Sequence, residues 1–182
     1  MRLNKFDYYS DYVAYPIVVG ALGAAAVVAD TRHDLLLWCG ALACGFTLWT
    51  LAEYWIHRVV LHRMPYFSPM HGEHHADPMG LIGTPTWISL PTLGAAVLLP
   101  AWALLGLNVG SGLFVGVIGG YVWYGAVHHL IHHQPRFGAL RELRVRHLRH
   151  HYFPQRGNFG VTTSLWDFVF GTSLGGKSRA GH

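Results

Sequence analysis

Closely spaced histidines are the residues of this sequence that could do chemistry. The chain has 182 residues and 14 histidines. Near the C-terminus, His147, His150 and His151 spell H-x-x-H-H. Positions i, i+3 and i+4 share one face of a helix, so a helix here would bring three imidazoles to one point. Three earlier groups are His57 with His62, His71 with His74 and His75, and His128, His129, His132 and His133.

So many imidazoles predict a metal centre. Imidazole suits iron, zinc, copper or nickel, and a mononuclear zinc site needs only three or four protein ligands. Ten or more histidines therefore imply two metals, each with room for an exogenous oxygen ligand. The expected ligands are His57, His62, His71, His74, His75, His128, His132, His147, His150 and His151. His129 and His133 would point about 100° away from the third group's other pair on a helix, so they are kept as additional candidates.

Composition indicates where such a centre lies. Hydrophobic residues make up 52% of the chain and charged residues only 12%, which is unusually apolar for a soluble domain. Four apolar runs, at about 13–29, 35–56, 87–107 and 112–131, have the length that a spanning helix needs. We expect an all-α fold in one membrane-embedded domain, 1–182. Its four-helix bundle would carry a histidine-rich helical cap, 57–86 and 132–182, which holds the di-metal site.

Lys and Arg predict which side of the membrane carries the cap. With four spans, every Lys and Arg except Arg32 lies on the side of the two termini and the four histidine groups. The positive-inside rule makes this side cytoplasmic. We expect an integral multi-pass protein of a bacterial plasma membrane, with the termini and the metal site in the cytoplasm. Nucleic-acid binding is disfavoured, because the basic residues are interleaved with ligand candidates and the net charge is only +4.

Carboxylates near the histidines are candidates for orienting them. Glu53 lies four positions before His57, so on a continuous helix its carboxylate would accept the imidazole N–H. An ionisable group inside an apolar run is a functional candidate by default. Glu73 and Asp77, beside the second histidine group, either do the same or are ordinary solvated carboxylates.

Five runs of the sequence together resemble a known family. EYWIHRVVLH, HGEHH, HHLIHH and HLRHH are followed by NFGVTTSLWDFVFGT. They resemble the fatty acid hydroxylase superfamily, membrane di-metal enzymes that include fatty acid 2-hydroxylases and sterol desaturases. The similarity covers about 35–172 and is strongest to the fatty acid 2-hydroxylase catalytic domain. Carried over motif by motif, it implies the same ten histidines as ligands. Asn158 and Asp167 fall in the closing run, where they either support ligands or make the turns that fold the tail over the site.

The resemblance implies an O2-dependent lipid hydroxylase with a di-iron centre, acting near the head group of a fatty acyl chain at the 2-position. Iron is expected because zinc has no accessible redox change, although such a site can capture zinc during purification. Eukaryotic members often carry a fused cytochrome b5 domain and this chain has none. Electrons are therefore expected from a separate cytochrome b5-like or ferredoxin-like protein. Trp123 and Tyr124 are candidates either to line the path of a membrane lipid substrate or to anchor the chain at the interface.

Two alternatives stay open. A desaturase or methyl oxidase acting on sterol-type or carotenoid-type lipids would use the same metal site with a different substrate geometry. A non-catalytic metal-binding membrane protein would belong to another class. A transport path would require histidines distributed along the spans, whereas in this sequence they are concentrated on one side of the membrane. This arrangement disfavours a transporter. Resemblance in fold does not by itself fix the substrate.

Overall fold

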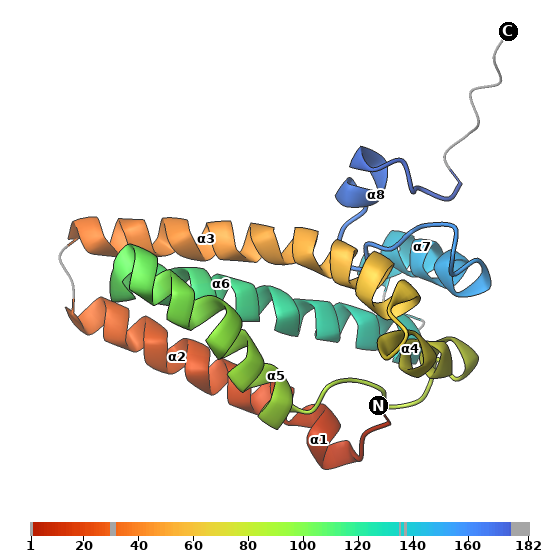
Figure 1. The fold of residues 1–182 in the computed structure, drawn as a ribbon, viewed down its shortest axis with the longest axis horizontal. Coiled ribbons are helices and arrows are strands. Elements are labelled where there is room, and N and C mark those ends of the chain that lie inside the picture. Colours follow the sequence, from red (N-terminus) through yellow and green to blue (C-terminus); the bar gives the residue numbers. More distant parts are fainter. Residues whose placement is uncertain (1, 30–31, 135, 137, 176–182) are drawn as a thin grey trace, which may run out of the picture. The chain divides into compact units, whose positions relative to one another are not determined.

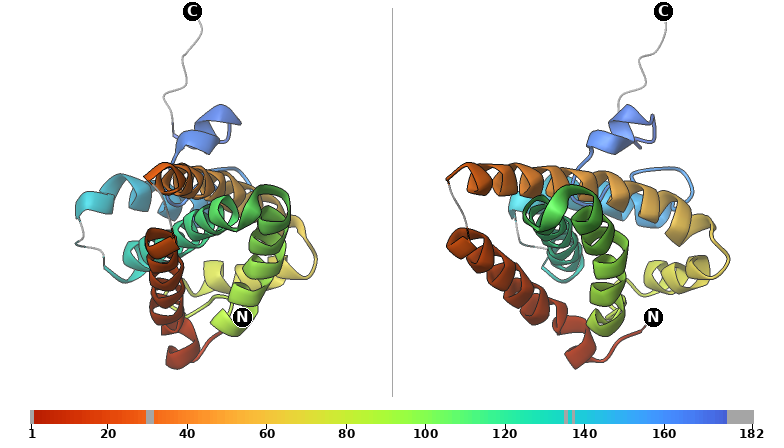
Figure 2. Two further views of the ribbon diagram at one scale, coloured as in Figure 1. Left: turned by 90° about the vertical axis from the view of Figure 1, so that its left-hand side faces the viewer. Right: turned by 60° about the vertical axis from the view of Figure 1, so that its left-hand side comes forward.

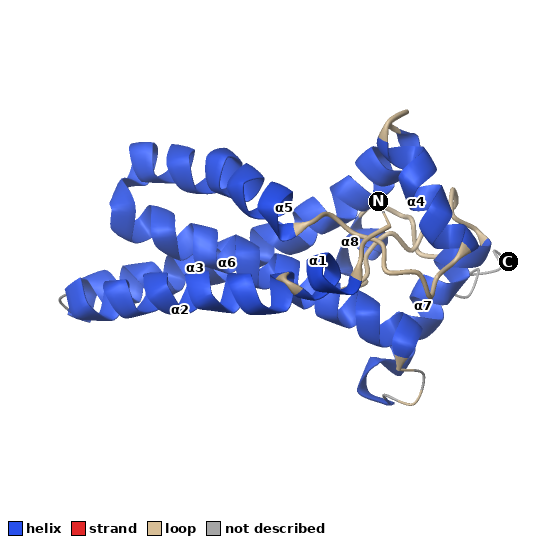
Figure 3. Cartoon of the chain, turned by 90° about the horizontal axis from the view of Figure 1, so that it is seen from below, coloured by secondary structure: helices blue, strands red, loops and turns tan. Residues whose placement is uncertain are grey.

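The computed structural model describes residues 2–29, 32–134, 136 and 138–175 (Figure 1). Its elements are α1 (Lys5–Tyr9), α2 (Asp11–Ala29), α3 (Arg32–Trp55), η1 (Ile56–Leu61), α4 (Phe67–Ala76), α5 (Thr86–Leu93), η2 (Gly94–Leu98), α6 (Leu99–His133), η3 (Gly138–Leu140), α7 (Arg141–Tyr152) and α8 (Leu165–Val169). Within the described residues, Figure 3 shows only helices and the loops that join them. The predicted all-α class is confirmed.

Three helical stretches are long and apolar enough to cross a membrane: Lys5–Val28, Asp34–Leu61 and Thr86–His133. Large apolar side chains project outward along them, and Val28 and Leu104 are 86% and 81% exposed. A contiguous surface of this kind is suited to lipid and unsuited to water.

The third stretch turns back on itself. Its 48 residues would extend about 72 Å as one helix, more than twice the ~30 Å hydrocarbon core of a bilayer. Gly106 interrupts it with φ 80° and ψ 164°, a conformation that glycine adopts readily. A Cβ placed on Gly110 would lie 2.7 Å from the backbone nitrogen of Trp102, so the chain has reversed between these residues. The reversal falls near the expected boundary between 87–107 and 112–131. The number of membrane crossings stays a prediction.

The chain divides into two compact units, and a single domain over 1–182 stays a prediction. The first unit comprises Met1–Trp49 and Gly80–Trp123. Within it, α3 and α6 pack backbone to backbone (Figure 2). A Cβ on Gly45 would lie 2.1 Å from the carbonyl oxygen of Leu113, and a Cβ on Gly116 would lie 2.1 Å from that of Leu42. Small residues at these crossings permit the close approach that stabilises helix pairs in membranes.

The second unit comprises Thr50–Met79 and Tyr124–His182. Its described part contains the last turns of α3 and α6 together with η1, α4, α7 and α8. A small apolar core forms where Val161, from the segment after α7, packs with Val127 and Ile131 of α6. All four histidine groups belong to this unit.

Candidate metal centre

Ten histidines of the second unit gather into two groups of five. Group A is His57, His62, His71, His75 and His150, and group B is His74, His128, His132, His147 and His151. Within each group, one ring nitrogen from every histidine lies within 4.8 Å of the others. The two groups contain the same ten histidines that the sequence singled out. Their arrangement provides five donors to each of two positions, while metal ligation itself stays a prediction.

Each H-x-x-H-H motif is divided between the two groups. The i, i+4 pair of a motif enters one group and its middle histidine enters the other. Group A takes His71, His75 and His150, and group B takes His74, His147 and His151. The expectation that the three imidazoles of one motif converge on a single point was therefore wrong. On a helix, residues i+3 and i+4 differ by about 100° around the axis, which lets one motif serve two metal positions.

A π-helical turn brings His57 and His62 together. Five positions in an α-helix would turn the second side chain about 140° away from the first. Here the chain forms η1 immediately after α3, with His57 inside it and His62 at its C-cap. A π-helix bonds i to i+5 and so places residues five apart on one face. The two rings are stacked, with centroids 5.1 Å apart.

Two group A histidines have their tautomer fixed by backbone carbonyls. His57 donates from Nδ1 to the carbonyl oxygen of Phe159 at 2.6 Å, and His150 donates from Nδ1 to that of Gly157 at 2.9 Å. Carbonyls only accept, so Nδ1 carries the proton and Nε2 presents a lone pair. These Nε2 atoms face those of His71 at 3.1 Å and His62 at 3.0 Å. A cation at this point would be stabilised by the converging lone pairs.

Group B has similar contacts between ring nitrogens. Nε2 of His147 lies 3.0 Å from that of His132 and 3.1 Å from that of His151. His128 and His74 approach each other through their Nε2 atoms at 3.0 Å. Among the described residues, Nδ1 of both His147 and His151 is buried without a hydrogen-bond partner, whereas in group A this holds for Nδ1 of His75 alone. Group B is therefore less firmly oriented than group A.

Burial keeps the clustered imidazoles neutral. Burial first, and then the neighbouring histidines, lower the pKa of His62 to about 4 and the pKa of both His74 and His150 to about 3. The pKa of His147 lies well below its ordinary value for the same reasons. A metal binds the unprotonated nitrogen. At neutral pH, protons therefore do not compete for these ligands, and the donor set fits two metal ions.

Glu53 holds the loop that follows α7 and makes no hydrogen bond with His57. Its Oε1 accepts from the backbone N–H of Val161 at 2.7 Å and of Thr162 at 2.9 Å, and its Oε2 accepts from Oγ1 of Thr162 at 2.6 Å. The expected hydrogen bond between Glu53 and His57 was wrong. The π-helical turn moves His57 off the α-helical i+4 position, and the Phe159 carbonyl takes its Nδ1 proton.

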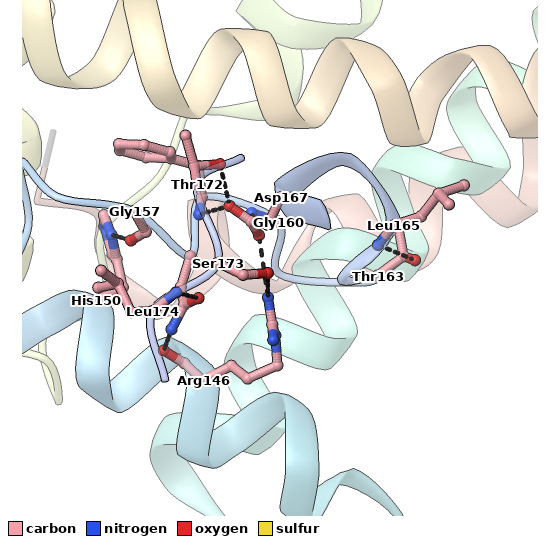
Figure 4. Close-up of polar contacts among 12 residues, drawn as sticks. Arg146, His150, Gly157, Gly160, Thr163, Leu165, Asp167, Thr172, Ser173 and Leu174 are labelled. Carbon is pink, nitrogen blue, oxygen red and sulfur yellow. Dashed lines mark hydrogen bonds and ion pairs between the residues drawn. The ribbon is translucent and has the colours of Figure 1, made fainter. Parts of the chain in front are cut away.

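Asp167 fixes the part of the same loop that precedes Val161 (Figure 4). Its Oδ1 accepts from the N–H of Phe159 at 2.9 Å, and its Oδ2 accepts from the N–H of Gly160 at 3.0 Å. Arg146 lies 3.5 Å from Oδ2 in an ion pair. Both carbonyls that orient group A, those of residues 157 and 159, thus belong to one clamped segment, here called the closing loop (residues 157–163).

Asn158 makes the turn of the closing loop. It is the described non-glycine residue with a positive φ, 57°, a conformation that Asn tolerates better than most residues. Its side chain donates to the carbonyl of Arg146 at 3.1 Å and accepts from the N–H of Leu174 at 2.8 Å. The two roles left open for Asn158 and Asp167 are therefore linked: they fold the tail, and the folded tail orients His57 and His150.

The other sequence candidates lie on α4, at its C-cap and on α6. Glu73 is exposed on α4, which favours a solvated carboxylate, and Asp77 is the C-cap residue of that helix. His129 and His133 fall outside both groups and stack on each other, with centroids 4.4 Å apart. Neither residue contributes a ring nitrogen to group A or group B.

The two aromatic candidates differ in their surroundings. The Tyr124 ring is stacked on His128, with centroids 5.8 Å apart, so Tyr124 borders group B. Trp123 is 48% exposed, as an interface anchor would be. Sequence reasoning missed the carbonyls of Gly157 and Phe159, because a backbone acceptor carries no residue-type signal. The only hint was that Phe159 lies in the closing run NFGVTT and that Gly157 directly precedes this run.

Comparisons with known proteins agree with this geometry. The family model described as fatty acid hydroxylase matches residues 42–172. The dihydroceramide fatty acyl 2-hydroxylase FAH2 of Arabidopsis thaliana is 36% identical over 91% of this chain and 72% of its own length. The ceramide very long chain fatty acid hydroxylase SCS7 of Saccharomyces cerevisiae is 35% identical, over 95% of this chain and 47% of its own. Human fatty acid 2-hydroxylase is 35% identical, over 73% and 39%.

A solved structure shares the fold as well. The visible hydroxylase domain of full-length scs7p matches with a TM-score of 0.81 and 30% identity, over 98% of this chain and 73% of that one. Sequence, fold and histidine groups thus agree, and the resemblance inferred from the histidine motifs is confirmed. The chain belongs to the fatty acid hydroxylase family and is an integral membrane oxidoreductase.

Proposed function

We propose that this protein hydroxylates a fatty acyl chain of a membrane lipid at its 2-position, using O2 and two iron ions. The observation that carries the proposal is the pair of five-histidine groups whose neutral ring nitrogens converge on two positions. The relatives named as 2-hydroxylases support the choice of reaction and of carbon. Two of the relatives are named for dihydroceramide or ceramide, so an amide-linked acyl chain is the first substrate class to test.

The histidine groups would hold the irons with nitrogen donors alone. Bound there, two irons would supply the redox chemistry by which O2 and two external electrons oxidise an unactivated C–H bond. Zinc lacks that capacity. The chain's own contribution is to keep the imidazoles neutral by burial and to fix the rotation of His57 and His150 through the closing loop.

The substrate approaches from the bilayer in this proposal. The helices that lead into η1 and that carry His128 belong to candidate spans, so an acyl chain could reach the centre without leaving an apolar environment. Tyr124, stacked on His128, is proposed to line the acyl path, and Trp123 is proposed to contact lipid beside it.

We further propose that the metal centre faces the cytoplasm of a bacterium and receives electrons from a separate cytochrome b5-like or ferredoxin-like protein. The placement of Lys and Arg supports this orientation. Arg141 at the start of α7 is exposed and available to an acidic donor. Arg144 serves the fold, because it donates to the carbonyl of Ile131 at 2.5 Å.

Mass spectrometry of lipids tests the proposal. Cells expressing the protein with a redox donor and supplied with iron would be compared with cells expressing His150→Ala, and with His133→Ala as a matched control outside both groups. A lipid that gains one oxygen atom with the intact protein and the control, but not with His150→Ala, is the expected result. Fragmentation would place the oxygen at the 2-position. Loss of two hydrogens would instead indicate a desaturase. An unchanged lipid profile from iron-loaded protein with a reducing donor would contradict both.

A further inference from the structure

Helix α8 presents an apolar face outward. Phe168 is 80% exposed, Val169 is 54% exposed and Leu165 is 51% exposed, while Asp167 on the opposite side is fully buried. Asp167 is the only charged residue of this helix. A short helix with its polar side turned inward and its apolar side outward is the reverse of what water favours.

This helix is packed on a helix of a candidate membrane span. Nε1 of Trp166 donates to Oγ1 of Thr50 at 3.0 Å. The Phe170 ring is stacked on Tyr54, with centroids 5.2 Å apart. Thr50 and Tyr54 both belong to α3, within the span Asp34–Leu61. The outward face of α8 therefore lies beside a segment that is itself suited to lipid.

The adjoining end of α3 has the composition of a membrane boundary. Trp55 is 41% exposed, and its ring lies 5.1 Å from that of Phe170. The Arg58 guanidinium lies over the Trp55 ring at 5.5 Å. Trp is enriched at the boundary between bilayer and water, and long basic side chains reach from there to the headgroups. Ile56, 38% exposed, continues the apolar surface.

We propose that α8 lies in the membrane interface, with the apolar patch of Leu165, Phe168, Val169, Phe170, Trp55 and Ile56 against the lipid bilayer. Continuity with the lipid-suited surface of α3 favours lipid over a soluble protein as the occupant. The patch is also uncharged apart from Arg58 at its border, whereas encounter with a soluble redox protein is usually steered by charge. Apolar side chains below the headgroups with a cationic rim are the pattern of an interfacial helix.

The placement connects the bilayer to the metal centre within the second unit. The outward side of α8 meets lipid, and its inward Asp167 holds the N–H groups of Phe159 and Gly160. The Phe159 carbonyl in turn orients His57. Within the second unit, α8 thus links the proposed lipid contact to the closing loop that orients His57.

Spin labels on the full chain in phosphatidylcholine and phosphatidylglycerol vesicles test the proposal. Cys39 and Cys44 would first be replaced by Ala. Labels at Phe168→Cys and Leu165→Cys are compared with Gln155→Cys, an exposed polar position in the loop after α7. The readout is relaxation by O2, which concentrates in lipid, against relaxation by a water-soluble nickel chelate.

The expected ratio of O2 to nickel accessibility is several-fold higher at positions 168 and 165 than at 155. Equal nickel accessibility at all three positions would overturn the proposal by placing α8 in water. Low accessibility to both reagents would also overturn it, because the patch would then be covered by protein. Two labelled positions on one face keep the result independent of the failure of either variant to fold.

Discussion

The Nδ1 atom of His57 donates a 2.6 Å hydrogen bond to the carbonyl oxygen of Phe159, 102 positions further along the chain. This contact joins the start of the histidine-rich region to the closing loop and decides which nitrogen of His57 is free. Glu53 and Asp167 hold the loop from two sides. Two buried carboxylates thus hold the loop whose carbonyls orient His57 and His150, and neither of them hydrogen-bonds to a group A histidine.

Replacing the Glu53 carboxylate should loosen the centre without removing a ligand. Glu53→Gln places an N–H2 group among three donors, and each unsatisfied buried donor costs on the order of 1 to 3 kcal/mol. We expect a lower melting temperature in detergent and reduced metal content. Glu142→Gln on the exposed start of α7 is the matched control. Equal metal content and stability in both variants would show that Glu53 does not support the loop.

The two metal positions should differ in how easily they are emptied. In group A, His57 and His150 are fixed by backbone carbonyls and Nδ1 of His75 is buried without a partner among the described residues. In group B, Nδ1 of both His147 and His151 lacks such a partner. Hydrogen bonds that orient a metal-binding histidine in this way change metal affinity by about 10-fold to 100-fold. Under increasing chelator, metal per chain measured by elemental analysis should therefore fall in two steps.

Asp167→Asn assigns these steps. Loss of the Asp167 carboxylate weakens the loop that orients group A. Group A is expected to lose its metal in the second step, so only that step should move to lower chelator concentration. Loss of both metals in a single step would contradict the difference between the groups. A shift confined to the first step would reverse the assignment.

Acidification should destabilise the metal-free protein. Histidines whose folded pKa is depressed, to about 4 at His62 and about 3 at His74 and His150, bind fewer protons when folded than when unfolded. Their contribution is fully present above the unfolded pKa of about 6.5 and is lost as pH falls toward the folded values. We expect the melting temperature to be constant above pH 7 and to fall between pH 6.5 and 5, where most carboxylates are still ionised. A melting temperature that rises as the pH falls from 6.5 to 5 would contradict the neutral state of the clustered imidazoles.

The stacked pair His129 and His133 should be dispensable for metal binding. Both lie outside the two groups, so Ala at both positions should leave metal content unchanged. His132→Ala, one position before His133 and inside group B, should lower it. If the double variant lost as much metal as His132→Ala, this would indicate that His129 and His133 are metal ligands.

The histidine centre was largely readable from sequence, because imidazole is a distinctive ligand and its spacings are local. Residues such as His147 and His151 needed only a helix to face one point. The division of each motif between two groups required the opposing helices, which no local spacing contains. The expected hydrogen bond between Glu53 and His57 assumed that α3 continues as an α-helix. His57 instead lies in a π-helical turn, which α-helical periodicity does not predict.

Backbone groups account for the other omissions. The Phe159 carbonyl is chemically the same as every other carbonyl, so its role depends on a fold that places it against His57. The chain reversal at Gly106 falls near the break expected between 87–107 and 112–131, but a single glycine inside the first run did not mark its position. The sequence alone does not show that Phe168 is exposed while Asp167 is buried. The outward apolar face of α8 could therefore be recognised only in the structure.

Metal analysis of active protein tests the central claim most directly. Protein purified from iron-supplied cells would be assayed for lipid hydroxylation with a reduced donor, and its metal content would be measured on the same sample. The account predicts two iron ions per chain, and activity that falls in proportion as iron is removed and returns when iron, but not zinc, is restored. Full turnover by protein that contains zinc and no redox metal would contradict it.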